Sequence, residues 1–115
     1  MTEPADDTAR QTFETIIAIL TQERADVAPG KMMSSPGVTL RGKVFAFFDR
    51  GEMVFRLGKG VDPASLGITS YRPLSPFKNK PPLAGWFYVA ASERQHWERL
   101  ARTALERLAA ELHAL

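Results

Sequence analysis

The side chains that most often perform acid–base or nucleophilic chemistry are scarce in this chain and poorly placed for it. Its two histidines, His96 and His113, both fall on the last predicted helix, about five helical turns apart, so one site cannot use both. Ser34 and Ser35 have no neighbouring base, and no nucleophile elbow, zinc-binding His-Glu-x-x-His pattern or phosphate-binding loop occurs. The absence of cysteine excludes thiolate nucleophiles, thiolate metal sites and disulfides. The sequence therefore predicts a protein that is not an enzyme, with no metal site and no cofactor.

A different chemistry, the binding of an anion, is favoured by the uneven distribution of charge. Residues 31–80 contain nine Lys or Arg against three acidic residues, whereas residues 1–30 are acidic and residues 81–115 are balanced. Lysines and arginines can neutralise phosphates while a ring such as Tyr71 or Phe77 stacks on a base. The alternative is an ordinary hydrated sheet with a proline-stiffened loop. The candidate cations for an anion or a nucleic acid are Arg41, Lys43, Arg72, Lys78 and Lys80.

Protein binding is favoured by a predicted strand that is apolar on both faces. In Val44–Phe48, strict alternation puts Val44, Ala46 and Phe48 on one face and Phe45 and Phe47 on the other. Since one layer of helices covers one face only, a partner subunit or a folded-over segment must cover the second. We therefore expect a homodimer or another protein partner. The candidate interaction surface consists of Phe45, Phe47, Tyr71 and Phe77.

These candidates lie in a predicted series of short antiparallel strands. A first helix is expected over Asp7–Arg24, with Pro29-Gly30 turning the chain after it. Strands are expected over Lys31–Ser35, broken by Pro36-Gly37, and over Val38–Leu40, Lys43–Asp49 and Met53–Leu57. The pairs Arg41-Gly42 and Arg50-Gly51 indicate hairpins, because glycine supplies the positive φ that a tight turn needs.

The second half of the chain predicts a short helix, a loop, a strand and a long helix. Asp62 should cap a short helix that Gly67 closes, and a proline-rich loop then precedes a strand over Gly85–Ala90. The last helix should begin at Ser92, with Gln95 completing a capping box. Its charged side offers the pairs Glu98–Arg102 and Arg107–Glu111 at i, i+4 spacing. Its apolar stripe comprises Trp97, Leu100, Ala101, Ala104, Leu105, Leu108 and Leu112.

Length and composition set the broad class. The 115 residues are the usual size of one domain, and 44% hydrophobic with 24% charged residues is typical of an ordinary globular protein. No apolar run reaches the roughly 20 residues that a membrane helix needs, and the N-terminus lacks the pattern of a secretory signal. We expect a single domain over residues 1–115 in the cytoplasm, with no membrane partner.

From Lys31 onward, the order of motifs resembles the TfoX N-terminal-like family. The stretches that carry the resemblance are Lys31-Met32-Met33, Gly37 to Phe47, Glu52 to Leu57, Pro76-Phe77 and Gly85 to Val89, followed by the amphipathic last helix. Such a domain, here without the C-terminal helical domain of full-length members, implies an α+β fold of α-β-β-β-α-β-α order. The implied architecture is a two-layer sandwich, a meandering antiparallel sheet packed against the terminal helices, similar to secretion-chaperone-like folds, which are often dimeric. The family has no established ligand or reaction.

These observations favour a non-catalytic interaction or regulatory module. The alternative is a transcription-related nucleic-acid-binding domain that uses the basic region 31–80. A salt-sensitive complex with an oligonucleotide, lost when Lys78 and Lys80 are changed to Glu, would indicate the alternative.

Overall fold

The structure is a computed structural model that describes residues 4–75 and 78–114, with two long helices and a six-stranded antiparallel sheet. The α+β class is confirmed, but the predicted α-β-β-β-α-β-α order is wrong because it has too few strands. The elements are α1 (Pro4–Glu23), β1 (Val27–Met32), β2 (Ser35–Leu40), β3 (Lys43–Asp49), β4 (Glu52–Arg56), the 3-10 helix η1 (Pro63–Leu66), β5 (Tyr71–Pro73), β6 (Trp86–Val89), the 3-10 helix η2 (Ala91–His96) and α2 (Trp97–Ala114).

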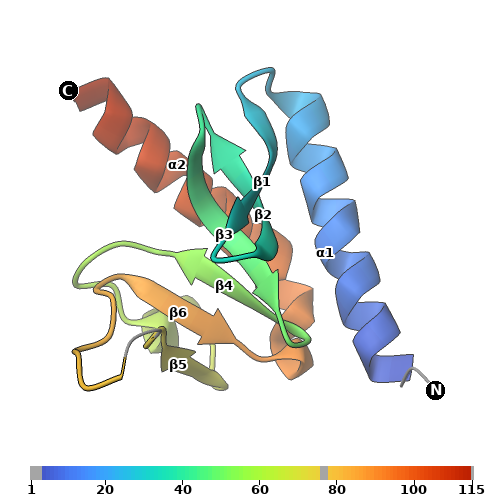
Figure 1. Ribbon diagram of the computed structural model, residues 1–115, viewed down its shortest axis with the longest axis vertical. Coiled ribbons are helices and arrows are strands. Elements are labelled where there is room, and N and C mark those ends of the chain that lie inside the picture. Colours follow the sequence, from blue (N-terminus) through green and yellow to red (C-terminus); the bar gives the residue numbers. More distant parts are fainter. Residues whose placement is uncertain (1–3, 76–77, 115) are drawn as a thin grey trace.

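The sheet is a meander whose strand order is β1-β2-β3-β4-β6-β5. All neighbouring strands are antiparallel. In Figure 1, α1 runs beside β1 while α2 crosses behind the sheet, with its C-terminal turns projecting past the β2–β3 hairpin. None of the described helices is long and apolar enough to cross a membrane.

The first hairpin differs from the prediction in where it turns. Pro29 and Gly30 lie inside β1, and Pro36 and Gly37 lie inside β2, so neither pair breaks a strand. Two residues of positive φ, Met33 (49°) and Ser34 (75°), form the turn instead. Proline is tolerated because β1 is an edge strand and because the pairing of β2 with β3 begins only at Gly37.

A register shift between β2 and β3 overturns the predicted alternation of Val44–Phe48. Val38 is paired with Ala46 but its neighbour Thr39 with Val44, so Phe45 is an extra residue on β3. Such a bulge re-aims the side chains on either side of it. Phe45 therefore joins Phe48 in the main core, whereas Val44 packs with Phe47 on the opposite face.

The main core lies between the sheet and both helices, and it confirms the predicted stripe of the last helix. Phe48 stacks on Phe13 of α1, with ring centroids 5.1 Å apart, and meets Trp97 of α2 edge-on at 6.5 Å. The stripe of α1 contributes Ala9, Phe13, Ile16 and Leu20, and that of α2 contributes Trp97, Leu100, Ala101, Ala104, Leu105 and Leu108, with Leu112 partly buried against them.

The second face of the sheet is covered by the chain itself. Phe47, Val54 and Leu74 are buried there in a smaller cluster, against which Leu83 packs. The amide of Leu83 donates to the carbonyl of Leu74 at 2.8 Å, which joins these two residues on either side of the loop between β5 and β6. A folded-over segment thus covers this face, so its burial needs no partner subunit and gives no reason to expect a dimer.

Of the two helix starts predicted near the 3-10 helices, the one at Asp62 is correct and the one at Ser92 is wrong. Asp62 accepts a hydrogen bond from the amide of Ala64 at 3.0 Å, and Gly67 closes η1 in a left-handed conformation, as predicted. The capping box at Ser92 is wrong, because η2 follows Ala90 without a side-chain cap and α2 begins only at Trp97. η2 itself is kinked at Glu93, whose φ of −104° and ψ of 15° are not helical.

Candidate functional site

The predicted cations do not form one surface. Arg41 lies in the turn between β2 and β3 and Lys43 begins β3, whereas Lys78 and Lys80 are exposed in the segment between β5 and β6, on a different part of the molecule (Figure 1). Arg41 is already engaged, since its Nε lies 3.4 Å from Asp26. Hydrogen bonds, chiefly from Arg24 and also from Arg41, lower the pKa of Asp26 to about 2.

Arg72 is also used within the fold. Its guanidinium is 2.7 Å from the Glu52 carboxylate and 4.1 Å above the ring of Tyr88. The Tyr88 hydroxyl donates to Asp49 at 2.8 Å, and burial followed by this bond raises the pKa of Tyr88. These contacts fasten β5 to its neighbours, so Arg72 is less available to an external anion than its position in the sequence indicated.

The predicted aromatic surface is not assembled either. Phe45 is 0% and Phe47 1% exposed, so a partner could not reach them in this structure. Tyr71 is half-buried, donates its hydroxyl to Asp62 at 3.0 Å and meets Phe87 edge-on at 6.0 Å. Phe77 lies outside the described residues.

The structure instead forms a basic groove that the sequence did not predict. It has a volume of about 620 Å³ and lies where the end of β4, the start of β6 and the last turns of α2 come together. A smaller hollow of about 230 Å³ adjoins it, shares Arg56 and Glu111, and adds Lys43. The residues lining the larger hollow, which we call the basic groove, are Arg56, Gly58, Lys59, Ala84, Trp86, Arg107, Ala110 and Glu111.

One ion pair crosses the groove. Arg56 donates to both carboxylate oxygens of Glu111, with N–O distances of 2.6 Å from Nη1 and 3.0 Å from Nη2. This hydrogen bonding raises the pKa of Arg56 and lowers that of Glu111. Glu111 was predicted to pair with Arg107 on its own helix; its hydrogen bonds instead go to Arg56, while the charge of Arg107 contributes a smaller lowering of its pKa.

The remaining cations give the groove its positive charge. Across the part of the chain that the structure describes, Lys43, Lys59 and Arg107 form no ion pair within 4.0 Å. The two hollows therefore hold four cations against the single carboxylate of Glu111. Three of the four lie in the basic segment 31–80, and the charge of that segment was the only feature of the sequence that pointed to them. Arg107 lies outside it.

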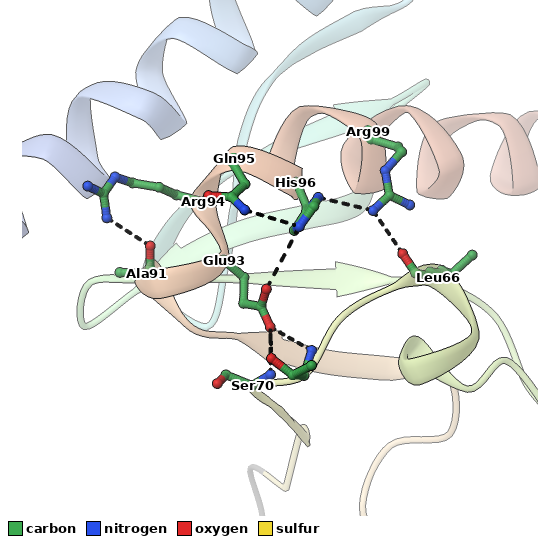
Figure 2. A network of polar contacts seen from close by, with 9 residues as sticks. Leu66, Ser70, Ala91, Glu93, Arg94, Gln95, His96 and Arg99 are labelled. Carbon is green, nitrogen blue, oxygen red and sulfur yellow. Dashed lines mark hydrogen bonds and ion pairs between the residues drawn. The ribbon is translucent and has the colours of Figure 1, made fainter.

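A separate network of polar contacts fastens the start of α2 to the loop before β5 (Figure 2). Glu93 is 7% exposed, and its Oε2 accepts hydrogen bonds from the Thr69 amide (2.6 Å), the Thr69 hydroxyl (2.8 Å) and the Ser70 amide (2.7 Å). These bonds, led by that from Ser70, lower the pKa of Glu93.

The same network explains the position of His96. Its Nε2 lies 3.9 Å from Glu93 Oε1, and its Nδ1 lies 3.2 Å from an Arg99 nitrogen that also donates to the Leu66 carbonyl at 2.8 Å. Because the contacts end on backbone groups of the chain, the arrangement is a structural clamp between η1, η2 and α2.

Replacing Glu93 with glutamine should lower the melting temperature at pH 7, because a neutral amide accepts hydrogen bonds from two amides and a hydroxyl less strongly than a carboxylate. The folded-state pKa lies below the ordinary value of 4.5, so this stabilisation is full above pH 4.5 and is lost as the pH falls through the folded-state pKa. The difference between wild type and Glu93→Gln should therefore shrink in acid. Thermal unfolding at pH 7 and pH 3 measures it, with the exposed Glu106→Gln as control; a constant difference would contradict the clamp.

Neither a metal site nor a match to another protein adds to this geometry. Among residues 4–75 and 78–114, no three His, Asp or Glu side chains lie together as metal ligands. Comparison with family models, with curated proteins and with solved structures finds no match to the chain.

Proposed function

We propose that this protein is a non-catalytic interaction module that binds an acidic segment of a partner protein in the basic groove. The observation that carries the proposal is the excess of cations around one hollow: among the residues that the structure describes, Lys59 and Arg107 have no ion pair and Glu111 is the only carboxylate lining it. A carboxylate entering the groove would gain charge-assisted hydrogen bonds at little cost to the fold. The likeness to TfoX N-terminal-like domains, and to a two-layer secretion-chaperone-like fold, stays a prediction.

The shape of the groove favours a peptide over an extended nucleic acid. Its cations surround one hollow with the half-buried Trp86 and the small side chains of Ala84 and Ala110 between them. A nucleic-acid footprint is usually a stripe of cations that follows a phosphate backbone. A peptide can place carboxylates on the cations and an apolar side chain against the indole ring.

Nucleic-acid binding remains the second proposal, and Lys78 and Lys80 support it. Both are exposed, lie close together in sequence and form no ion pair within the described residues. Neither of them lines the groove, so charge reversal at the two places separates the two proposals.

Changing Lys59 and Arg107 together to glutamate should weaken binding of a fluorescent hexaglutamate peptide by about tenfold or more, because both free cations of the groove are then replaced by carboxylates. A tenfold loss corresponds to about 1.4 kcal/mol of binding free energy. Fluorescence anisotropy at low salt measures the affinity, which should also fall as salt screens the charges. The Lys78→Glu/Lys80→Glu variant is the matched control, since it changes the net charge equally outside the groove.

Three results would decide against the acidic-peptide proposal. The first is equal weakening by the two double variants, which would indicate attraction by net charge alone. The second is the absence of hexaglutamate binding together with binding of a labelled oligonucleotide that the Lys78→Glu/Lys80→Glu variant loses, which would favour nucleic acid. The third is a hexaglutamine peptide that binds as well as hexaglutamate.

A further inference from the structure

The basic groove already contains one bound carboxylate, that of Glu111. Arg56 holds it with both terminal nitrogens, at 2.6 Å and 3.0 Å, which is the forked geometry by which arginine recognises any carboxylate. The two side chains come from residues 55 positions apart in the chain, so the contact is tertiary and does not follow from helix spacing.

Glu111 lies where its helix disfavours it. It is in the last turn of α2, which ends at Ala114, and the C-terminal end of a helix carries partial negative charge. An acidic residue is therefore unfavourable there unless nearby cations compensate. Hydrogen bonds from Arg56, with the charge of Arg107 assisting, lower the pKa of Glu111 and provide that compensation.

The ion pair is also open to exchange. The side chain of Glu111 is 53% exposed and that of Arg56 29% exposed, so solvent reaches both. Exposed ion pairs contribute little net stability, because water screens the charges and ordering two long side chains costs entropy. Exchanging the Glu111 carboxylate for a partner carboxylate on Arg56 therefore costs little free energy. An incoming segment can in addition reach Lys59 and Arg107.

We propose that Glu111 is an internal competitor, which a carboxylate of the partner segment displaces from Arg56. This inference rests on the proposed function and specifies how the groove is regulated. In the free protein Glu111 occupies the fork of Arg56. In the complex, the partner carboxylate takes both nitrogens of Arg56, and Glu111 turns out toward solvent. The same chemistry sets the ligand class: a carboxylate that can present both oxygens to one arginine.

Glu111→Gln should therefore bind hexaglutamate about threefold more tightly than wild type, as expected when a contact worth a surface ion pair no longer competes. The matched control is Glu14→Gln, an exposed position on α1 with the same change of net charge. Arg56→Lys should bind more weakly, because lysine lacks the fork.

A second readout follows the displacement itself. The Nε–H resonance of Arg56 should stay at one position in wild type until hexaglutamate is added, then move toward the position of a new bound state. Hydrogen exchange in the last turn of α2 should quicken on binding, because that turn loses its link to β4. A rigid ion pair with a purely structural role would show neither change.

The outcomes distinguish this inference from the proposed function. If Glu111→Gln binds no more tightly than Glu14→Gln while the Lys59→Glu/Arg107→Glu variant still loses affinity, displacement is wrong and the groove still binds acidic segments. If wild type does not bind but Glu111→Gln does, the internal competitor is supported. If neither binds hexaglutamate, both proposals are overturned.

Discussion

Replacing Phe48 with alanine should lower the free energy of unfolding by about 3–5 kcal/mol, the range measured for large aromatic residues in cores. The ring is 6% exposed and links three elements, since it stacks on Phe13 of α1 and contacts Trp97 of α2 while belonging to β3. Arg10 lies over the ring, with the guanidinium carbon 5.5 Å from the ring centroid. The substitution therefore removes packing from both helices at once.

Equilibrium unfolding in urea, followed by far-ultraviolet circular dichroism, measures the loss. Since domains of this size are stable by about 5–15 kcal/mol, the variant should keep only part of its stability and unfold at a clearly lower urea concentration. Phe87→Ala is the comparison, because that ring is only half-buried, and Phe48→Leu should recover part of the stability. A loss at Phe48 no larger than that at Phe87 would show that the ring does not join the two helices.

The parts of the fold that depend on local patterns were predictable. The buried stripes of α1 and α2 follow from helical periodicity, because hydrophobic burial selects residues three and four apart. The hairpins at Arg41-Gly42 and Arg50-Gly51 were predictable because glycine favours the positive φ that a tight turn needs. Both residues of each turn do adopt positive φ, with 52° at both arginines. In these cases the physical cause of the structure lies in residues that are close together in the sequence.

The parts that failed depend on which strands become neighbours. Pro29 is acceptable in β1 only because β1 is an edge strand, and the sequence does not show which strand is at the edge. The bulge at Phe45 arises from the register between β2 and β3, so alternation alone assigned that ring to the wrong face. The start of α2 was misplaced because Glu93 turns to bind the amides of Thr69 and Ser70, which are 23 to 24 residues away.

The basic groove could not be predicted for the same reason. Its cations come from β4, the segment after it and α2, which only the fold brings together. The charge count indicated the basic segment that contains Arg56 and Lys59. A sequence does not show, however, which of its lysines and arginines are exposed and which are packed against other residues. Local spacing favoured an Arg107–Glu111 pair, whereas the tertiary partner Arg56 provides the fork.

Gly85→Ala should be among the most destabilising single changes near the groove, with an expected loss of about 2–5 kcal/mol. Gly85 has a φ of 84°, which an alanine adopts only with strain, and an added Cβ would lie 2.6 Å from the carbonyl carbon of Gly58. The close approach is part of the fold, because the Gly85 carbonyl accepts hydrogen bonds from the amides of Leu57 (2.7 Å) and Gly58 (3.1 Å).

Gly60→Ala separates the two causes of this loss. Its φ of 79° is almost the same, but an added Cβ would meet nothing within 4 Å, so only conformational strain applies. A loss of about 1–2 kcal/mol is expected there, partly offset because alanine restricts the unfolded chain. Urea unfolding of the two variants measures the difference, which isolates the contact between the β4 end and the β6 start.

Because Gly58 and Trp86 line the groove on the two sides of this contact, Gly85→Ala should also weaken hexaglutamate binding, whereas Gly60→Ala should not. Equal losses in stability at the two glycines would show that the backbones can separate without cost, and the groove would then lack the rigid floor that an acidic ligand needs.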